Sequence, residues 1–313
     1  MELIRGLHNL APRHRGCVVS IGNFDGLHLG HQALIARLLA LSREHGLPST
    51  VMVFEPTPRE FFAPDSAPPR ITGFRGKLRL LQRAGIDRVL LLRFDRRLAN
   101  LDAADFVQRI LVEGLGARAV VVGDDFRFGH KRGGDVALLE RMGATAGFSV
   151  DGLGCVKAGE LRYSSTAVRD ALALPDLAQA QRLLGRRYRV IGRVRRGLQL
   201  GRKLGMPTAN LMMRHKPALA HGVYAVKAYW PGCPEGAHGV ASLGVRPTLG
   251  MTACLLETHV FGGPLELYGV EMEIELWAYQ RPQLRFDSLD ALAAQMQADG
   301  EEARKFLAVH NGS

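Results

Sequence analysis

The first half of the chain alternates short apolar runs with stretches of helical periodicity. Four apolar runs are typical of buried strands: Cys17–Ile21, Ser49–Phe54, Arg88–Leu92 and Ala117–Val122. Four other stretches carry apolar residues at helical spacing: Leu29–His45, Lys77–Ala84, Ala103–Val112 (with Asp102 as its N-cap) and Asp135–Gly143. Repeated strand–helix units of this kind predict an α/β domain with a doubly wound parallel sheet.

The pattern changes near Gly185. The preceding residues, Ser164 to Leu184, are helical in pattern and are divided by Pro175. Five strand-like runs separated by glycines and prolines follow: Tyr188–Val194, Val223–Trp230, Gly239–Leu243, Leu255–Phe261 and Glu271–Ala278. They predict a mainly β domain, an antiparallel barrel or sandwich, which the amphipathic helix Ser288–Val309 closes.

The length of 313 residues supports two domains, since a single core rarely grows past about 250–300 residues. We place them at residues 1–184 and 185–313. The sequence contains no stretch of roughly 18 uncharged apolar residues and no secretory signal at its start. The four cysteines form no C-x-x-C pair, so we expect reduced thiols in a cytoplasmic protein, with Cys17 and Cys254 buried.

The charge is the unusual feature of the composition. Lysine and arginine number 41 against 30 acidic residues, a formal net charge of +11. Such a balance suggests acidic partners, which include nucleic acid, an anionic surface and phosphorylated small molecules. Aromatic residues make up only 7%, and we find no basic stripe with interleaved aromatics and no reading helix. These observations argue against a nucleic-acid-binding protein. It stays the alternative of another class, and a salt-dependent gel shift would test it.

A candidate phosphate site follows the first predicted strand. The segment from Gly22 to His31 reads G-N-F-D-G-L-H-L-G-H and leads into the first helix. A helix N-terminus offers unpaired N–H groups to a phosphate, and glycines allow the backbone to approach it closely. His28 and His31 lie three residues apart, on one face of a helical turn. The alternative is a capped helix start with solvated histidines, but the position after strand one and the three glycines favour phosphate binding.

A second candidate loop, from Gly197 to Asn210, reads G-L-Q-L-G-R-K-L-G-M-P-T-A-N. Its glycines and basic residues suit a loop folded over phosphates, and the oxygens of Thr208 and Asn210 suit Mg²⁺ bridged to a nucleotide. Taken alone, the segment is equally consistent with a barrel hairpin. The sequence contains neither G-x-x-x-x-G-K-[ST] nor a G-x-G-x-x-G after a strand, so both familiar nucleotide motifs are absent.

The first segment resembles the H-x-G-H motif of the Rossmann-like nucleotidyltransferases. Together with F-E-P-T-P (54–58), G-D-D-F-R-F-G (123–129) and S-S-T-A-V-R (164–169), it resembles the prokaryotic bifunctional riboflavin kinase/FAD synthetases. The second half resembles the kinase half of that family through L-G-M-P-T-A-N (204–210), S-L-G-V-R-P-T (242–248) and L-E-T-H (256–259). The resemblance extends from about Val18 to the final helix.

For the first domain the resemblance implies transfer of the adenylyl group of ATP to FMN, with release of pyrophosphate. His28, His31 and Arg169 would be catalytic. The phosphates of ATP would be bound by a larger set: Gly22, Asn23, Phe24, Gly30, Ser164, Ser165 and Thr166. The flavin would contact residues of the middle motifs: Phe54, Pro56, Pro58, Asp124, Asp125 and Phe126.

For the second domain the resemblance implies ATP-dependent phosphorylation of riboflavin, with Glu257 as the catalytic carboxylate. On an alternating strand, Glu257 and His259 share one face, and Leu256 and Thr258 share the other. Further implied contacts are Gly201, Lys203 and Gly205 to ATP, Arg246 to the flavin, and Thr208 and Asn210 to Mg²⁺. ATP, riboflavin, FMN and FAD are the implied substrates and products, without a nucleic-acid or membrane partner, and an oligomer is possible.

Overall fold

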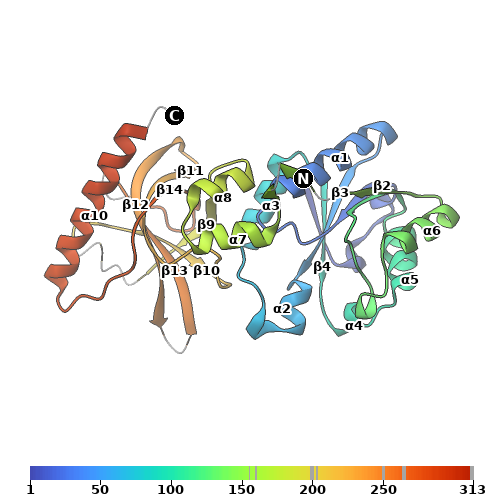
Figure 1. The fold of residues 1–313 in the computed structure, drawn as a ribbon, viewed down its shortest axis with the longest axis horizontal. Coiled ribbons are helices and arrows are strands. Elements are labelled where there is room, and N and C mark those ends of the chain that lie inside the picture. The colour runs from blue at the N-terminus through green and yellow to red at the C-terminus, as the bar shows by residue number, and fades with distance from the viewer. Residues whose placement is uncertain are drawn as a thin grey trace. The chain divides into compact units, whose positions relative to one another are not determined.

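The computed structural model describes residues 1–154, 156–158, 161–197, 201, 204–248, 251–262 and 266–310 (Figure 1). These residues form two compact units. The first comprises Met1–Pro68 and Lys77–Ser164, and the second comprises Pro69–Gly76 and Ser165–Ser313. The second unit thus includes the helices α7 (Ser165–Ala173) and α8 (Leu177–Leu184), separated at Pro175 as the sequence predicts. The domain boundary that we predict, between residues 184 and 185, lies at the end of α8. That the two activities divide at this point stays a prediction.

A six-stranded sheet forms the centre of the first unit, with every neighbouring pair parallel and the order β1-β4-β3-β2-β5-β6. Its strands are β1 (Glu2–Arg5), β2 (Cys17–Ile21), β3 (Ser49–Glu55), β4 (Arg88–Arg93), β5 (Ala117–Gly123) and β6 (Ser149–Leu153). The four central strands are those that the apolar runs predict. The edge strands β1 and β6 were missed because they are short or carry polar residues such as Asp151.

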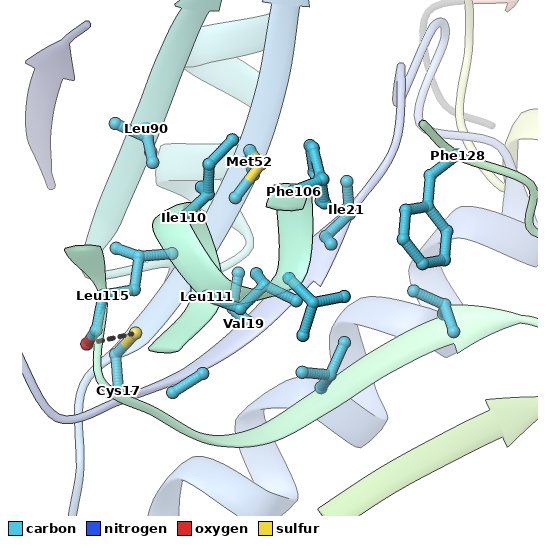
Figure 2. Packing of buried hydrophobic residues seen from close by; sticks show 14 of the residues in the cluster. Cys17, Val19, Ile21, Met52, Leu90, Phe106, Ile110, Leu111, Leu115 and Phe128 are labelled. Atoms are coloured by element: carbon cyan, nitrogen blue, oxygen red, sulfur yellow. Dashed lines mark hydrogen bonds between the residues drawn. The ribbon is translucent and has the colours of Figure 1, made fainter. Parts of the chain in front are cut away.

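Helices cover both faces of this sheet, which confirms the doubly wound prediction. On one face Leu38 of α1 (Leu29–His45) and Leu81 of α3 (Phe74–Arg83) pack in a cluster with alternate strand residues such as Val51. On the other face Phe106 of α5 (Ala103–Phe106) and Ile110 pack against strand residues on β2, β3 and β4 (Figure 2). The helix α6 (Val136–Ala146) adds Leu139 to that second cluster.

The predicted helix at Ala103–Val112 differs in detail. Only α5 is α-helical, and a π-helical segment, η4 (Val107–Gly114), continues it. The Leu115 amide donates to the Ile110 carbonyl, five residues earlier, at 2.9 Å. Asp102 occupies the N-cap position but its side chain accepts no capping hydrogen bond, whereas the Asp135 carboxylate accepts one from the Leu138 amide at 2.9 Å. Asp102 is thus the N-cap residue that the sequence predicts, but it lacks the side-chain hydrogen bond that usually accompanies this position.

The short elements of the first unit lie between these strands and helices. They are α2 (Pro58–Phe62), α4 (Arg96–Ala99), the hairpin of β7 (Lys157–Ala158) and β8 (Leu161–Arg162), and the 3-10 turns η1 (Leu7–Asn9), η2 (Pro12–His14), η3 (Pro64–Ser66) and η5 (His130–Arg132).

The second unit contains a closed antiparallel barrel, in the order β10-β13-β12-β11-β14-β9, and not a sandwich. Its strands are β9 (Arg189–Arg195), β10 (Ala209–Met213), β11 (Gly222–Trp230), β12 (Cys233–Thr248), β13 (Met251–Val260) and β14 (Glu271–Arg281). The long helix α10 (Leu289–His310) packs along the outside of β11, β12 and β14 (Figure 1). Its Ala303 and Leu307 are fully buried against Val223 and Val240 of the barrel. Only β10 was missed by the sequence analysis.

Two cysteines lie where the sequence analysis expects them. Cys17 and Cys254 are buried, and burial raises the pKa of both thiols, that of Cys254 to about 11. They are neutral packing groups at ordinary pH. Cys155 lies outside the described residues. None of the helices that the structure describes is both long enough and apolar enough to cross a membrane.

Candidate active sites

The carboxyl ends of β2 and β5 are adjacent, because these two strands are parallel neighbours in the sheet. The strand order reverses at this pair: β3 lies on the other side of β2, and β6 on the other side of β5. Ligands of open parallel sheets bind at such a switch point, outside the carboxyl ends of the strands. The predicted phosphate segment leaves β2 here, and Asp124 to Phe126 leave β5. The sheet thus brings together two motifs that are about a hundred residues apart.

The turn after β2 is compact and its conformation is unusual. Phe24, Gly26 and Leu27 all have positive φ, at 47°, 79° and 43°. The side chains of Phe24 and Leu27 are buried in the core beneath the turn, whereas Asn23 is exposed. A Cβ on Gly22 would lie 3.2 Å from the Phe24 ring, so a larger residue would crowd this turn. The buried Phe24 ring therefore anchors the turn from below.

His28 and His31 lie together at the start of α1. Nδ1 of His28 accepts the His31 amide at 3.4 Å, which makes His28 the N-cap of the helix, and the two rings stack at 3.8 Å. Because Nδ1 accepts, a neutral His28 carries its proton on Nε2 and can donate from there. A Cβ on Gly30 would lie 3.0 Å from the Tyr163 carbonyl oxygen, so the chain leading to Ser164 passes over this helix start.

The other residues that the sequence predicts for the first site lie on α7, after β5, and on or after β3. Ser165, Thr166 and Arg169 belong to α7 of the second unit, where Nε of Arg169 donates to the Pro69 carbonyl at 2.8 Å. Asp125 forms an exposed ion pair with Arg162 at 3.6 Å. After β5 lie the exposed Asp124 and the Phe126 ring, which stacks on Phe128. Phe54 lies on β3, and the cis-bonded Pro56 and Pro58 at the start of α2 follow that strand.

An aromatic cluster beside Phe54 was missed by the sequence analysis. The Phe94 ring, just after β4, lies 5.9 Å from Phe54, 5.5 Å from Phe61 and 5.7 Å from Phe62. Phe62 is 66% exposed, which is unusual for so large an apolar side chain. The signal available in the sequence was the adjacent pair Phe61 and Phe62, which follows the F-E-P-T-P motif (54–58) after two residues.

The second unit holds a cavity of about 380 Å³ between the barrel and α10. Glu257 and His259 line it, whereas Leu256 and Thr258 are fully buried on the other face of β13, so the predicted alternation is confirmed. The apolar walls come from three regions: Leu204 and Met206 before β10, Val223, Val240 and Val245 on the barrel, and Leu284, Phe286, Leu292 and Met296 near α10. Gly201 and Thr208 line the same cavity.

Asn210 lies opposite Glu257 in the pairing of β10 with β13. Its side chain is 4% exposed; Nδ2 donates to the Thr208 carbonyl at 3.5 Å, and the buried Oδ1 has no hydrogen-bond partner among the described residues. A Cβ on Gly197 would lie 2.6 Å from Nδ2, so a side chain at this position would displace the Asn210 amide. The chemistry of this unsatisfied buried oxygen fits a hard cation such as Mg²⁺, which keeps phosphate and water ligands besides one or two from the protein.

The remaining predicted kinase residues are these. Gly201 packs closely against the chain before β10, since a Cβ there would lie 2.4 Å from the Met206 carbonyl oxygen. Gly205 has φ of 75°. Arg246 lies on β12 opposite Ala253, but its side chain is outside the described part of the structure, and Lys203 lies wholly outside the described residues.

A buried ion pair closes one side of the cavity. The Arg281 guanidinium, at the end of β14, donates from Nε to Oδ1 of Asp299 at 2.7 Å and from Nη2 to Oδ2 at 2.5 Å. Gln295 also donates to Oδ1, at 2.9 Å. Because Asp299 is only 5% exposed, this fork ties α10 to the barrel in a largely dry environment.

We expect Asp299→Ala to lower the free energy of unfolding of the second unit by about 2–3 kcal/mol, because it leaves the largely buried Arg281 charge without its partner. Both tryptophans, Trp230 and Trp277, lie in this unit, so urea unfolding followed by tryptophan fluorescence reports it selectively. Glu301→Ala, at an exposed position of the same helix, is the control and should change stability little. Equal effects of the two substitutions would contradict a special role for the pair.

Comparisons with known proteins agree with this geometry. A family model described as FAD synthetase matches residues 10–167, and one described as riboflavin kinase matches residues 184–307. Curated proteins named bifunctional riboflavin kinase/FMN adenylyltransferase are similar along the whole chain. That of Pseudomonas fluorescens is 47% identical and that of Escherichia coli K12 is 46% identical, each over 98% of this chain and 98% of the relative. The chain belongs to the bifunctional riboflavin kinase/FMN adenylyltransferase family.

The fold is also shared with a solved structure. A crystal structure described as a macrolide-efflux protein from Streptococcus pneumoniae superposes with a TM-score of 0.78 and 28% sequence identity, over 97% of this chain and 99% of that one. The parallel-sheet unit and the barrel unit are thus a combination that both chains adopt. The two family models match the two halves of this chain, with the FAD synthetase model on the first half and the riboflavin kinase model on the second.

Proposed function

We propose that the chain makes FMN and then FAD in two successive reactions. In the first, the 5′-hydroxyl oxygen of riboflavin attacks the γ-phosphorus of ATP, and FMN and ADP are released. In the second, a phosphate oxygen of FMN attacks the α-phosphorus of another ATP, and FAD and pyrophosphate are released. The observation that carries the proposal is the position of Glu257 in an apolar-walled cavity that Thr208 and Gly201 also line.

In the kinase reaction Glu257 accepts or orients the proton of the attacking hydroxyl, which an alcohol requires before it can attack phosphorus. The apolar walls of the cavity exclude water from the flavin, and Arg246 contacts it from β12. Gly201, Lys203 and Gly205 hold the phosphates of ATP. Thr208 and Asn210 hold Mg²⁺, which neutralises charge on those phosphates when it is bound.

In the adenylyl transfer no strong base is needed, because the FMN phosphate is already an anion. The chain contributes positioning and charge stabilisation at the α-phosphate. Nε2–H of His28 and the stacked His31 donate to phosphate oxygens at the start of α1, where the helix dipole adds to the attraction. The remaining predicted contacts keep their roles, with Gly22, Asn23, Phe24, Gly30, Ser164, Ser165, Thr166 and Arg169 at the phosphates, and Phe54, Pro56, Pro58, Asp124, Asp125 and Phe126 at the flavin.

The test is a time course with riboflavin, ATP and Mg²⁺, with the flavins separated by chromatography. FMN should appear first and FAD should follow, and omission of Mg²⁺ should stop FMN formation. Persistence of riboflavin would overturn the kinase assignment, whereas FMN that is never converted would overturn the adenylyltransferase assignment alone. The proposed function requires no nucleic-acid or membrane partner. Because both reactions consume ATP, we propose that the enzyme works in the cytoplasm.

The division of the activities leads to a prediction on two fragments. Residues 185–313 should phosphorylate riboflavin and make no FAD, because Glu257 and its cavity lie wholly within them. Residues 165–313 should do the same with greater stability, since α8 packs on β14 and its Leu183 and Leu184 are fully buried. Their loss costs about 3 kcal/mol or more. Tryptophan fluorescence in urea compares the two; an inactive but folded 185–313 fragment would contradict the boundary.

A further inference from the structure

His259 shares the cavity with Glu257 and has no role in the reaction as proposed above. It follows Glu257 by two residues on β13, so both side chains point to the same face of the strand. The His259 side chain is only 9% exposed, and its Nδ1 lies 2.9 Å from the carbonyl oxygen of Pro207. A carbonyl can only accept, so Nδ1 carries the proton, and Nε2 of the neutral ring is then without one.

The orientation of this ring is fixed from the side of α10. The Phe261 ring packs edge-on against His259 with 5.8 Å between centroids, and the guanidinium of Arg304 lies 4.0 Å over the Phe261 ring. An imidazole held in this way acts as a rigid donor towards the loop in front of β10. The contact therefore depends on tertiary packing and not on the local sequence around Pro207.

The Pro207 carbonyl belongs to the planar peptide group that joins Pro207 to Thr208. A hydrogen bond to its oxygen therefore fixes the plane from which Thr208 departs. The next carbonyl, that of Thr208, accepts Nδ2 of Asn210 at 3.5 Å, so two successive peptide groups are held by side chains. Upstream, the Met206 amide donates to the Gly201 carbonyl at 2.8 Å.

We propose that His259 is a positioning residue of the kinase site, which holds the Pro207–Thr208 peptide so that the Thr208 hydroxyl faces the nucleotide phosphates. The inference rests on the proposed kinase function. It predicts that loss of the Nδ1 donor weakens nucleotide binding, because the part-buried Pro207 carbonyl loses its partner and the peptide plane rotates. It also predicts that the ring takes no part in proton transfer, which belongs to Glu257.

Three variants of the full chain test the inference: His259→Asn, His259→Gln and His259→Leu. The asparagine amide nitrogen takes nearly the place of Nδ1, whereas the glutamine amide reaches the place of Nε2. We expect His259→Leu and His259→Gln to raise KM for ATP about tenfold, with kcat and KM for riboflavin changed less than about threefold, as loss of one hydrogen bond to a part-buried carbonyl implies. His259→Asn should stay within about threefold of the unchanged enzyme in KM for ATP. Urea unfolding followed by the fluorescence of Trp230 and Trp277, which lie in the same unit as His259, measures whether each variant is folded.

Calorimetric titration with ADP and Mg²⁺, without riboflavin, gives a readout independent of turnover, and should show the same order of the variants. The inference is overturned if His259→Gln restores function and His259→Asn does not, or if kcat falls while KM for ATP is unchanged. If His259→Leu does not fold, the comparison of the asparagine and glutamine variants decides. If the enzyme without substitutions shows no kinase activity, the proposed function itself is refuted, and this outcome is distinct from those of the variants.

Discussion

Glu257→Gln should lower riboflavin kinase turnover by about 10²–10⁴, the usual range for general-base assistance. The substitution keeps the size and hydrogen-bonding reach of the side chain but removes its negative charge. KM for ATP should change little, because the proposed nucleotide contacts are Thr208 and the segment from Gly197 to Asn210, and not Glu257. The measurement is the initial rate of FMN formation from riboflavin at saturating ATP and Mg²⁺.

Two controls make this result specific. FMN supplied directly should become FAD at the ordinary rate, because His28 and His31 lie in the other unit. Glu235→Gln changes an exposed glutamate on β12, away from the residues that line the cavity, and should leave both activities unchanged. Near-normal kinase turnover of the Glu257 variant would remove the carboxylate from the chemistry and leave it as a polar wall of the cavity.

His31→Ala should lower FAD formation from FMN by about 10²–10³, since one preorganised donor to a developing charge has an effect of that size. FMN formation from riboflavin should persist. The structure makes His31 the better target of the two histidines. His28 also caps α1 through Nδ1, so its removal combines the chemical effect with a capping loss of about 1 kcal/mol.

The role of His28 can be separated by His28→Asn, which retains an N-cap oxygen and removes the imidazole. We expect it to fold like the unchanged enzyme and to lose adenylylation nearly as strongly as His31→Ala. His45→Ala, at the exposed far end of the same helix, is the matched control for a histidine on α1. If both activities fell together in a folded His31 variant, the assignment of the two reactions to separate units would be wrong.

Much of the fold could be predicted from local pattern. The four central strands of the sheet, α1 and the barrel strands other than β10 are strong signals, because their apolar residues repeat at the period of the element they form. The failures have physical causes. The strand β10 begins inside a glycine- and proline-containing loop motif, and the chain around η4 takes a π-helical form that apolar spacing does not distinguish from α-helix.

The roles of the predicted site residues stay predictions, and the contacts around them could not be read from local pattern. The spacing of His28 and His31, and the alternation of Glu257 and His259, are local properties of a helix start and a strand. The aromatic cluster at Phe94 and the Arg281–Asp299 pair bring together residues from different elements, for which no local periodicity is diagnostic. The hydrogen bond from His259 to Pro207 likewise joins residues 52 positions apart.

The sequence by itself determined most of the strands and helices, which side chains share a face, and which motifs carry the family resemblance, because these follow from backbone periodicity and residue chemistry. Only the tertiary structure decided that the β half closes into a barrel, that β2 and β5 are neighbours at the switch point, and that α10 walls the cavity around Glu257. The physical reason is that strand pairing and helix docking are chosen by the burial of apolar surface between distant segments. That choice depends on how all the segments pack together, and no single stretch of sequence contains it.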